Sequence, residues 1–236
     1  MIKEAVIIAG GFGTRLSGVL QGTPKPMAPV NGRPFLDYQL AYLAFNGIKK
    51  VIFAVGYLHE QIIQHFGNRF GDIRIDYSIE TEPLGTGGAV KQAITKAEGV
   101  TVLVLNGDTL FELDLPKFHD FYRMRDTKLA IAMREVDDVS RYGGIEVDWD
   151  GQITAFYEKS EAGGKGKING GIYLIDKNFL LEQDLPAKFS LEKDFFEKVY
   201  TQHKIYGMLC RRYFIDIGVP EEYAKTQDDF SYFRYF

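Results

Sequence analysis

The stretch Ala5-Val6-Ile7-Ile8-Ala9-Gly10-Gly11-Phe12-Gly13-Thr14-Arg15-Leu16 decides the fold of this chain. Its apolar, largely β-branched beginning is typical of a buried strand. The glycines that follow let backbone N–H groups come close to phosphate oxygens, and Arg15 adds a guanidinium that can bind a phosphate through two hydrogen bonds. A buried strand that opens into an anion-binding loop predicts an α/β protein with its ligand at the carboxyl end of the sheet.

Short apolar runs alternate with amphipathic stretches in the first half of the chain. We expect strands at 5–9, 51–55, 73–79 and 100–105, and helices at 34–46, 60–66 and near 89–97. This alternation predicts a mostly parallel sheet covered by helices on both faces, as in a Rossmann-like three-layer sandwich. Asp108 and the glycine loop both follow apolar strands, so both should lie at the ligand edge of that sheet.

The pattern changes after about residue 127. Further strands are expected at 128–135, 144–149, 153–158, 169–175 and 205–210, with a hairpin turn at Asp150-Gly151. We expect them to extend the same sheet, so that residues 1–236 form a single domain with a mixed sheet. The aromatic residues 231–236 should pack on the body of the protein or on a partner subunit, so a homo-oligomer is left open.

Bulk composition limits the kinds of partner. The net charge of the 236 residues is −4, so the surface as a whole does not attract nucleic acid or an anionic membrane. The apolar run at 5–9 is too short for a signal peptide or a membrane span. Cys210 is the only cysteine, which fits a reducing compartment. We therefore predict a soluble cytoplasmic protein without nucleic-acid or membrane partners.

Two motifs near the N-terminus suit phosphate binding. The glycine loop is not a P-loop, because no Gly-Lys-Ser/Thr follows it, and Leu16 stands where a dinucleotide fingerprint has its third glycine. A merely structural turn is the alternative for this loop. In Pro24-Lys25-Pro26-Met27, the prolines fix the backbone around one lysine, which can aim its ammonium at a phosphate. A solvated surface lysine is the alternative there.

Gly-Gly-x-Gly-Thr-Arg-Leu followed by Pro-Lys-Pro-Met resembles the signature of the sugar-1-phosphate nucleotidyltransferases. The resemblance covers essentially the whole chain and implies their GT-A-like α/β fold, with a nucleotide-binding half at 1–127 and a sugar-binding half at 128–236. It also implies that Arg15 and Lys25 act in catalysis by holding the triphosphate. The nucleotide-binding residues that it implies in this loop are Gly10, Gly11, Gly13 and Thr14.

The segment Glu82-Pro83-Leu84-Gly85-Thr86-Gly87-Gly88-Ala89 resembles the family's base-recognition loop. That similarity implies nucleotide contacts from Gly85, Thr86 and Gly87, where small residues let a base lie against the main chain. A plain strand-to-helix turn is the alternative. Guanine can be read by a carboxylate that accepts from N1–H and the 2-amino group, and Glu80 is our hypothesis for that residue.

Two aspartates are candidate ligands of Mg²⁺, a hard cation that prefers carboxylate oxygens and substrate phosphates. Asp108 ends the apolar strand at 100–105, and Asp216 lies between Ile215 and Ile217. The resemblance assigns both to the metal site, and Asp108 also to catalysis. A helix cap before Pro220 is the alternative for Asp216.

Three later segments match the sugar-phosphate site of the family. Tyr157-Glu158-Lys159 implies that Glu158 binds sugar hydroxyls and Lys159 the phosphate. Asn169-Gly170-Gly171-Ile172-Tyr173 implies a sugar contact from Asn169. Arg141-Tyr142-Gly143-Gly144 implies that Gly143 and Gly144 line the sugar pocket. Each segment also has an ordinary structural interpretation, as a charged strand end, a bulge and a turn.

The implied reaction joins a nucleoside triphosphate to a sugar 1-phosphate and releases pyrophosphate. Among short members, the chain looks most like bacterial D-glycero-α-D-manno-heptose 1-phosphate guanylyltransferases, which implies GTP as a substrate and GDP-heptose as the product. Mannose 1-phosphate guanylyltransferase and hexose 1-phosphate thymidylyl- or uridylyltransferase are the enzymatic alternatives. A sugar-nucleotide-sensing regulatory subunit would be expected to lose Arg15, Lys25 or the aspartates. A glycosyltransferase would want an Asp-x-Asp motif, which Asn106-Gly107-Asp108 is not.

Overall fold

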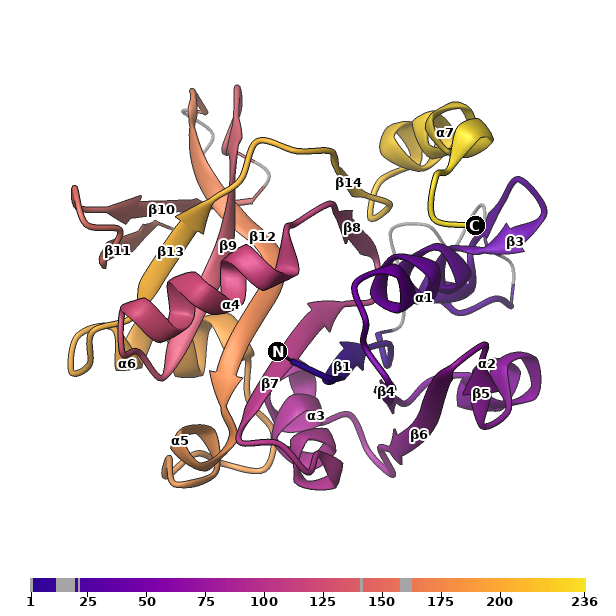
Figure 1. Ribbon diagram of the computed structural model, residues 1–236, viewed down its shortest axis with the longest axis horizontal. Helices are drawn as coiled ribbons and strands as arrows, with labels where there is room; N and C mark the ends of the chain where they lie inside the picture. The colour runs from indigo at the N-terminus through magenta and orange to yellow at the C-terminus, as the bar shows by residue number, and fades with distance from the viewer. Residues whose placement is uncertain (1, 12–19, 21, 141, 158–162) are drawn as a thin grey trace.

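The computed structural model describes residues 2–11, 20, 22–140, 142–157 and 163–236. An eight-stranded sheet runs through it in the order β13-β9-β12-β7-β1-β4-β6-β5 (Figure 1). The strands are β1 (Glu4–Ile8), β4 (Lys50–Val55), β5 (Arg69–Phe70), β6 (Ile73–Ile79), β7 (Thr101–Asn106), β9 (Leu129–Val136), β12 (Gly166–Asp176) and β13 (Tyr206–Leu209).

Strand directions make this a mixed, mostly parallel sheet. β1 pairs in parallel with both β4 and β7, β4 pairs in parallel with β6, and β9 with β13. β12 runs antiparallel between β7 and β9, and the short β5 is antiparallel to β6. The expected α/β sheet is thus confirmed, and strands from both halves of the chain are hydrogen-bonded within it.

Helices cover both faces of the sheet, because alternate strand residues point to opposite sides. Ala5 and Ile7 belong to a core shared with α1, α2 and α4, whereas Val6 belongs to a second core shared with α3, α5 and α6. Figure 1 shows α1 and α4 together on one face. The helices are α1 (Phe35–Phe45), α2 (His59–Phe66), α3 (Gly85–Ala93), α4 (Leu115–Met124), α5 (Lys177–Leu181), α6 (Glu197–Val199) and α7 (Pro220–Asp229), with a π-helical turn, η4 (Leu191–Phe196). The predicted three layers are present.

Three small antiparallel pairs complete the architecture. β8 (Thr109–Phe111) pairs with β14 (Phe214–Asp216), β10 (Gly144–Val147) with β11 (Ile153–Tyr157), and β2 (Pro29–Val30) with β3 (Arg33–Pro34). The β8–β14 pair matters most for the site, because it joins the segment after β7 to a segment near the end of the sequence.

Helix α1 holds the backbone that follows β7. The side chain of Gln39, 1% exposed, donates from Nε2 to the carbonyl of Asn106 at 2.8 Å and to that of Thr109 at 2.6 Å. Aromatic residues from the end of the sequence pack on the same helix, with ring centroids 4.8 Å apart for Tyr38 and Phe233. The aromatic residues there therefore pack on the body, one of the two arrangements expected.

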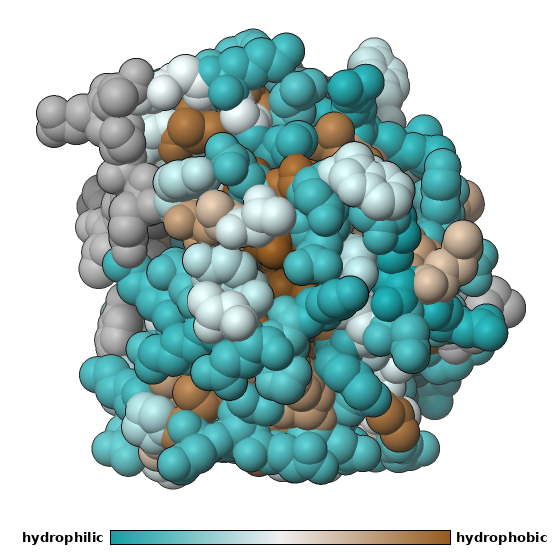
Figure 2. All heavy atoms as spheres, turned by 90° about the vertical axis from the view of Figure 1, so that its left-hand side faces the viewer, coloured by the Kyte–Doolittle hydropathy of each residue, from teal (hydrophilic) through white to brown (hydrophobic). Residues whose placement is uncertain are grey.

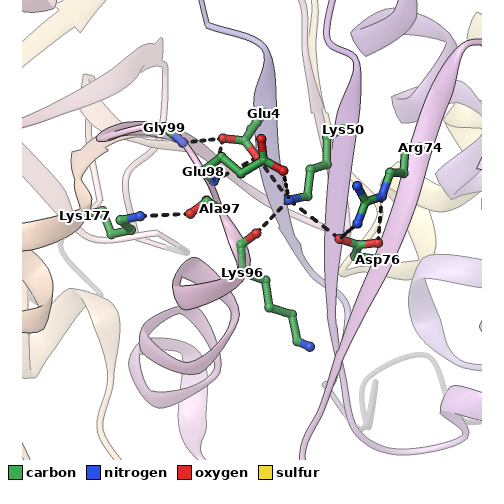
Figure 3. A network of polar contacts seen from close by, with 9 residues as sticks. All are labelled: Glu4, Lys50, Arg74, Asp76, Lys96, Ala97, Glu98, Gly99 and Lys177. Atoms are coloured by element: carbon green, nitrogen blue, oxygen red, sulfur yellow. Dashed lines mark hydrogen bonds and ion pairs between the residues drawn. The ribbon is translucent and has the colours of Figure 1, made fainter.

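A polar network fixes the opposite edge of the sheet, where β1 and β4 begin (Figure 3). The Glu4 carboxylate accepts hydrogen bonds from the amides of Glu98 and Gly99, and its Oε1 lies 3.3 Å from Nζ of Lys50. Lys50 also donates to the carbonyl of Lys96 at 2.7 Å. Burial alone would raise the pKa of Glu4, but these amides and the ammonium outweigh it and lower that pKa. The network therefore holds residues 96–99, the connection that leads into β7, against the beginning of β1 and β4.

The exterior is mixed in character. Figure 2 shows the face that carries β10, β11 and β13, where hydrophilic side chains dominate and apolar ones lie among them in small groups. Within the described ranges, no helix has the length and hydrophobicity that spanning a bilayer requires.

Candidate active site

Asp108 and Asp216 come together at the carboxyl edge of the sheet. Asp108 follows β7, and Asp216 is the last residue of β14, where it pairs with Thr109 across the β8–β14 ladder. The amide of Ile217 donates to the carbonyl of Asp108 at 3.0 Å, which extends this pairing by one step. Two carboxylates that are far apart in the sequence therefore lie side by side.

The ammonium of Lys25 lies between these two carboxylates. Its Nζ is 2.5 Å from Oδ2 of Asp108 and 3.9 Å from Oδ1 of Asp216. Lys25 begins the 3₁₀ turn Lys25–Met27, and the flanking prolines restrict its backbone as expected. The amide of Gly218 donates to Oδ1 of Asp216 at 2.7 Å, and this hydrogen bond also fixes the orientation of that carboxylate.

The donor set of this cluster fits Mg²⁺. In the described part of the chain, no three His, Cys, Asp or Glu side chains converge as a ready metal cage. Mg²⁺ is commonly bound by one or two carboxylates while substrate phosphates and water complete its shell. Asp108 and Asp216 supply such a pair, and both of them already lie within ion-pair distance of one ammonium group.

A pocket suited to a base lies beside the carboxyl end of β1. Its lining comprises Ile8, Gly10, Gly11, Glu80, Pro83, Gly85, Thr86 and Ala89. Oε2 of Glu80 accepts a hydrogen bond from the amide of Leu84 at 3.0 Å. Burial raises the pKa of Glu80, and the Leu84 amide opposes this only in part. A Cβ at position 10 would lie 2.5 Å from Oε1 of Glu80, so any side chain there would displace the Glu80 carboxylate from its present position.

The glycines of the expected base loop have different surroundings. Gly85 and Thr86 line the base pocket, and Gly85 has a φ of +71°. Gly87 lies against protein instead, because a Cβ there would be 2.1 Å from the ring of Phe189. The amide of Gly87 donates to the carbonyl of Phe189, and the amide of Phe189 donates to the carbonyl of Leu84. In the structure, Gly87 therefore packs against Phe189. Its contact with the nucleotide stays a prediction.

Two further pockets continue from the base pocket along the same edge. The middle one contains the Lys25–Asp108 ion pair and is lined by Ile8, Gly11, Lys25, Pro26, Thr86, Asn106 and Asp108. The last one is strongly polar and is lined by Asn106, Asp108, Thr109, Tyr142, Asn169, Gly171, Glu192, Phe214, Asp216 and Val219. Neighbouring pockets share residues, so together they form one continuous binding edge with the two aspartates inside it.

Asn169 reaches the polar pocket from a bulge in β12. The pairing of β12 with β9 shifts between Asn169 and Tyr173, and Gly171 within the bulge has a φ of +73°. Nδ2 of Asn169 donates to the hydroxyl of Tyr173 at 2.9 Å, and Oδ1 accepts from the amide of Gly171. Tyr173 is fully buried, and this burial raises the pKa of its hydroxyl well above the ordinary value. Both ends of the Asn169 side-chain amide are therefore fixed by hydrogen bonds to residues of β12.

The family now follows from comparison with known proteins. Residues 4–231 match the model of the family described as nucleotidyl transferase. The chain belongs to the nucleotidyl transferase family. The resemblance derived from the two N-terminal motifs is thereby confirmed.

Relatives within the nucleotidyl transferase family match the chain over nearly its full length. The D-glycero-alpha-D-manno-heptose 1-phosphate guanylyltransferase of Aneurinibacillus thermoaerophilus is 44% identical, over 98% of this chain and 99% of its own. The protein of the same description from Campylobacter jejuni is 43% identical, over 93% and 96%. The crystal structure of HddC from Yersinia pseudotuberculosis, also solved in complex with GMP-PN, has a TM-score of 0.87 at 39% identity and covers 98% of this chain and 100% of its own.

Several residues expected in this nucleotidyl transferase site lie outside the described residues. They are Gly13, Thr14, Arg15, Glu158 and Lys159, and their roles stay predictions. Tyr142 lines the polar pocket, whereas Gly143 and Gly144 stand next to it in the chain without being among its lining residues. Glu192 lines that pocket and was not anticipated. A short, charge-rich segment offers no motif from which to find it.

Proposed function

We propose that this nucleotidyl transferase transfers GMP from GTP to D-glycero-α-D-manno-heptose 1-phosphate, which gives GDP-heptose and pyrophosphate. The observation that carries the proposal is the position of the Asp108–Lys25–Asp216 cluster, which spans the middle and polar pockets and lies next to the base pocket. A transferase that joins two phosphates needs this order of sites, with base and sugar on opposite sides of the reacting phosphorus. The descriptions of the full-length relatives support the choice of base and sugar.

Guanine is the base that Glu80 suits best. A carboxylate can accept hydrogen bonds from both N1–H and the 2-amino group of guanine, whereas uracil and thymine lack the second donor. Ile8, Pro83 and Ala89 supply apolar walls for a flat ring in the same pocket. The complex of HddC with GMP-PN, a guanine nucleotide, supports this assignment.

The chemical step would depend on position and charge. The phosphate of a sugar 1-phosphate is already anionic at neutral pH, so no general base is needed for its attack on the α-phosphorus. Lys25 and Arg15 would hold the triphosphate and Lys159 the incoming phosphate, which places the reactants in line. Asp108 and Asp216 would hold Mg²⁺, which supplies charge neutralisation at the reacting phosphates when bound.

The polar pocket would receive the sugar, with Asn169 and Glu158 as contacts and Gly143 and Gly144 nearby. Mannose 1-phosphate and other hexose 1-phosphates are the alternative acceptors, paired with GTP, dTTP or UTP. We further propose that the enzyme works in the cytoplasm as a single-domain protein without nucleic-acid or membrane partners. A homo-oligomer stays an open prediction.

A matrix of substrates tests the proposal. Purified protein with MgCl₂ is assayed for pyrophosphate release with GTP, ATP, UTP and dTTP, each against heptose, mannose and glucose 1-phosphates. We expect the highest kcat/KM for GTP with the heptose 1-phosphate. A higher kcat/KM for another pair would replace the assigned substrates but keep the reaction. Nucleotide binding without turnover in any pair would favour the regulatory alternative.

A further inference from the structure

Glu192 places a third carboxylate in the polar pocket, on a different element from the two aspartates. It lies on η4, the π-helical turn at Leu191–Phe196, on the side of the sheet covered by α3. Asp108 and Asp216 line the same pocket. No three carboxylates of the described chain converge as a metal site, so Glu192 does not complete the metal cluster.

The orientation of this carboxylate is fixed through one of its oxygens. Oε2 accepts hydrogen bonds from Oγ1 of Thr86 at 2.9 Å and from Oγ of Ser190 at 3.1 Å. Among the described residues, no hydrogen bond or ion pair involves Oε1 of Glu192. Half of the acceptor capacity of a held carboxylate therefore remains for a ligand in the pocket.

The charges around the pocket determine which ligand groups can donate a hydrogen bond to Oε1 of Glu192. A sugar 1-phosphate brings a negative phosphate, and Asp108 and Asp216 already add negative charge nearby. A further carboxylate would repel such a ligand unless it accepts hydrogen bonds from it. Sugar hydroxyls are donors of that kind. Asn169, whose amide is held on the Tyr173 hydroxyl, lies in the same pocket and offers complementary polar groups.

The buried hydroxyl of Tyr173 lies below the polar pocket that Glu192, Asn169 and Asp108 line, since Asn169 donates to it. Burial is the main reason why the pKa of its hydroxyl is raised well above the ordinary value, and the negative charges of Glu192 and Asp108 add to that effect. Asn169 thus donates to a buried hydroxyl group that lies within electrostatic range of both Glu192 and Asp108.

Thr86 connects Glu192 to the base pocket. Thr86 lines both the base pocket and the middle pocket. Its Oγ1 donates to Glu192 and accepts from the amide of Leu191 at 2.9 Å. The same segment is fixed on α3 through Phe189. The wall of the polar pocket that carries Glu192 is therefore anchored on the loop that faces the nucleotide.

We propose that the Glu192 carboxylate accepts hydrogen bonds from hydroxyl groups of the sugar 1-phosphate and selects among sugars. The inference rests on the proposed function, because it requires a sugar 1-phosphate in the polar pocket. Glu192 is then a specificity-determining residue for the sugar substrate, because it lines the polar pocket and is not among the residues that line the base pocket or the middle pocket.

Glu192→Gln tests this role with little change in shape. We expect the KM for the best sugar 1-phosphate to rise about tenfold or more, as for loss of a hydrogen bond to a charged group, while the KM for GTP stays within about twofold. A second readout uses analogues of that sugar that each lack one hydroxyl group. For the hydroxyl that Glu192 contacts, wild type should discriminate against the analogue and the variant should discriminate far less. The exposed Glu182→Gln is the matched control and should leave both constants unchanged.

Each remaining outcome decides against the proposal. A sugar KM within about twofold of wild type, or intact discrimination against every analogue, overturns it. A joint rise of both KM values with a lower melting temperature would indicate a merely structural role and also overturns it; Glu192→Asp, which keeps the charge, should then restore stability. Wild-type protein inactive with every sugar 1-phosphate overturns this proposal together with the proposed function, whereas an active wild type with an unchanged Glu192→Gln variant overturns this one alone.

Discussion

The ammonium of Lys25 lies 2.5 Å from Oδ2 of Asp108, inside the middle pocket of the binding edge. A lysine in this position partly neutralises the carboxylate before any substrate arrives. Any cation that binds Asp108 must share it with Lys25 or displace it. The ion pair therefore links the residue expected to hold phosphates to the residue expected to hold the metal.

Replacing Asp108 with Asn should abolish most turnover. The amide keeps the shape of the side chain but removes the charge that pairs with Lys25 and that would hold Mg²⁺. We expect kcat to fall about 10²–10³-fold, as for loss of one preorganised charged group, with little change in melting temperature. Pyrophosphate release under saturating substrates measures this. Near-wild-type turnover would remove Asp108 from the metal site.

A side chain at Gly218 should lower activity without lowering stability, because it would displace the Lys25 ammonium. A Cβ at residue 218 would lie 2.8 Å from Nζ of Lys25 and 2.7 Å from Oδ1 of Asp216. The flexible Lys25 can move away, so Gly218→Ala should fold. We expect kcat to fall about ten- to a hundredfold through misplacement of the ammonium. Unchanged kcat in a stable variant would mean that the position of Lys25 is not critical.

The KM for GTP should depend on pH through Glu80. The pKa of its carboxyl is raised from the ordinary 4.5 by burial, so in the folded protein it gains its proton at a higher pH than an exposed glutamate does. Because guanine needs the ionised acceptor, the KM for GTP should rise as the pH falls through that raised pKa. Glu80→Gln should lose both this pH dependence and much of the preference for GTP over ATP. Steady-state kinetics between about pH 5 and pH 8 give both readouts, and an unchanged base preference would discard the hypothesis.

Gly87 offers a test of packing in the base loop. A Cβ there would meet the buried ring of Phe189 at 2.1 Å, so Gly87→Ala should lower the free energy of unfolding by about 1–3 kcal/mol through overpacking. In a Phe189→Ala background the ring is gone, and the same substitution should be neutral or stabilising because alanine favours a helix. Chemical denaturation of the four proteins in this cycle measures the difference. Equal costs in both backgrounds would contradict the assigned contact.

The polar network around Glu4 should contribute to acid stability. The pKa of Glu4 is lowered in the folded protein, since hydrogen bonds from Gly99 and Glu98 and the Lys50 ammonium outweigh burial. A lowered pKa means that the contribution is complete above the unfolded value and is lost as the pH falls through the folded value. Glu4→Gln should therefore cost about 1–3 kcal/mol at neutral pH and progressively less in acid. Glu98→Gln, whose side chain is 79% exposed, is the control and should cost little. Parallel unfolding curves for Glu4→Gln and wild type at all pH values would contradict this.

Strands with clear periodicity were predictable to within a few residues. The alternating apolar residues of 73–79 coincide with β6, and the run at 51–55 lies within β4 (Lys50–Val55). Helix α3 was expected near residue 89 but begins at Gly85. Glycines disfavour a helix locally, yet they are needed here because chain segment 187–189 packs directly on this turn. Tertiary contacts of this kind have no signal in the local sequence.

The site was predictable where a residue belongs to a motif and unpredictable where it does not. Lys25, Asp108 and Asp216 follow from their motifs, and the fold brings all three together. Glu192 begins a run of three charged residues that is followed by Phe195 and Phe196, and this segment carries no binding motif. Its place in the pocket depends on the hydroxyl of Thr86, a hydrogen bond between segments that are distant in the sequence.

The hydrogen bonds of Gln39 bear on how the site responds to ionic strength. Its uncharged amide holds the carbonyls on both sides of Asp108, at 2.8 and 2.6 Å, from within the protein interior. Dissolved salt screens the attraction between the protein and an anionic substrate that approaches through solvent, but it has little effect on hydrogen bonds between buried neutral groups. High ionic strength should thus weaken substrate affinity while leaving the frame of the reaction centre in place.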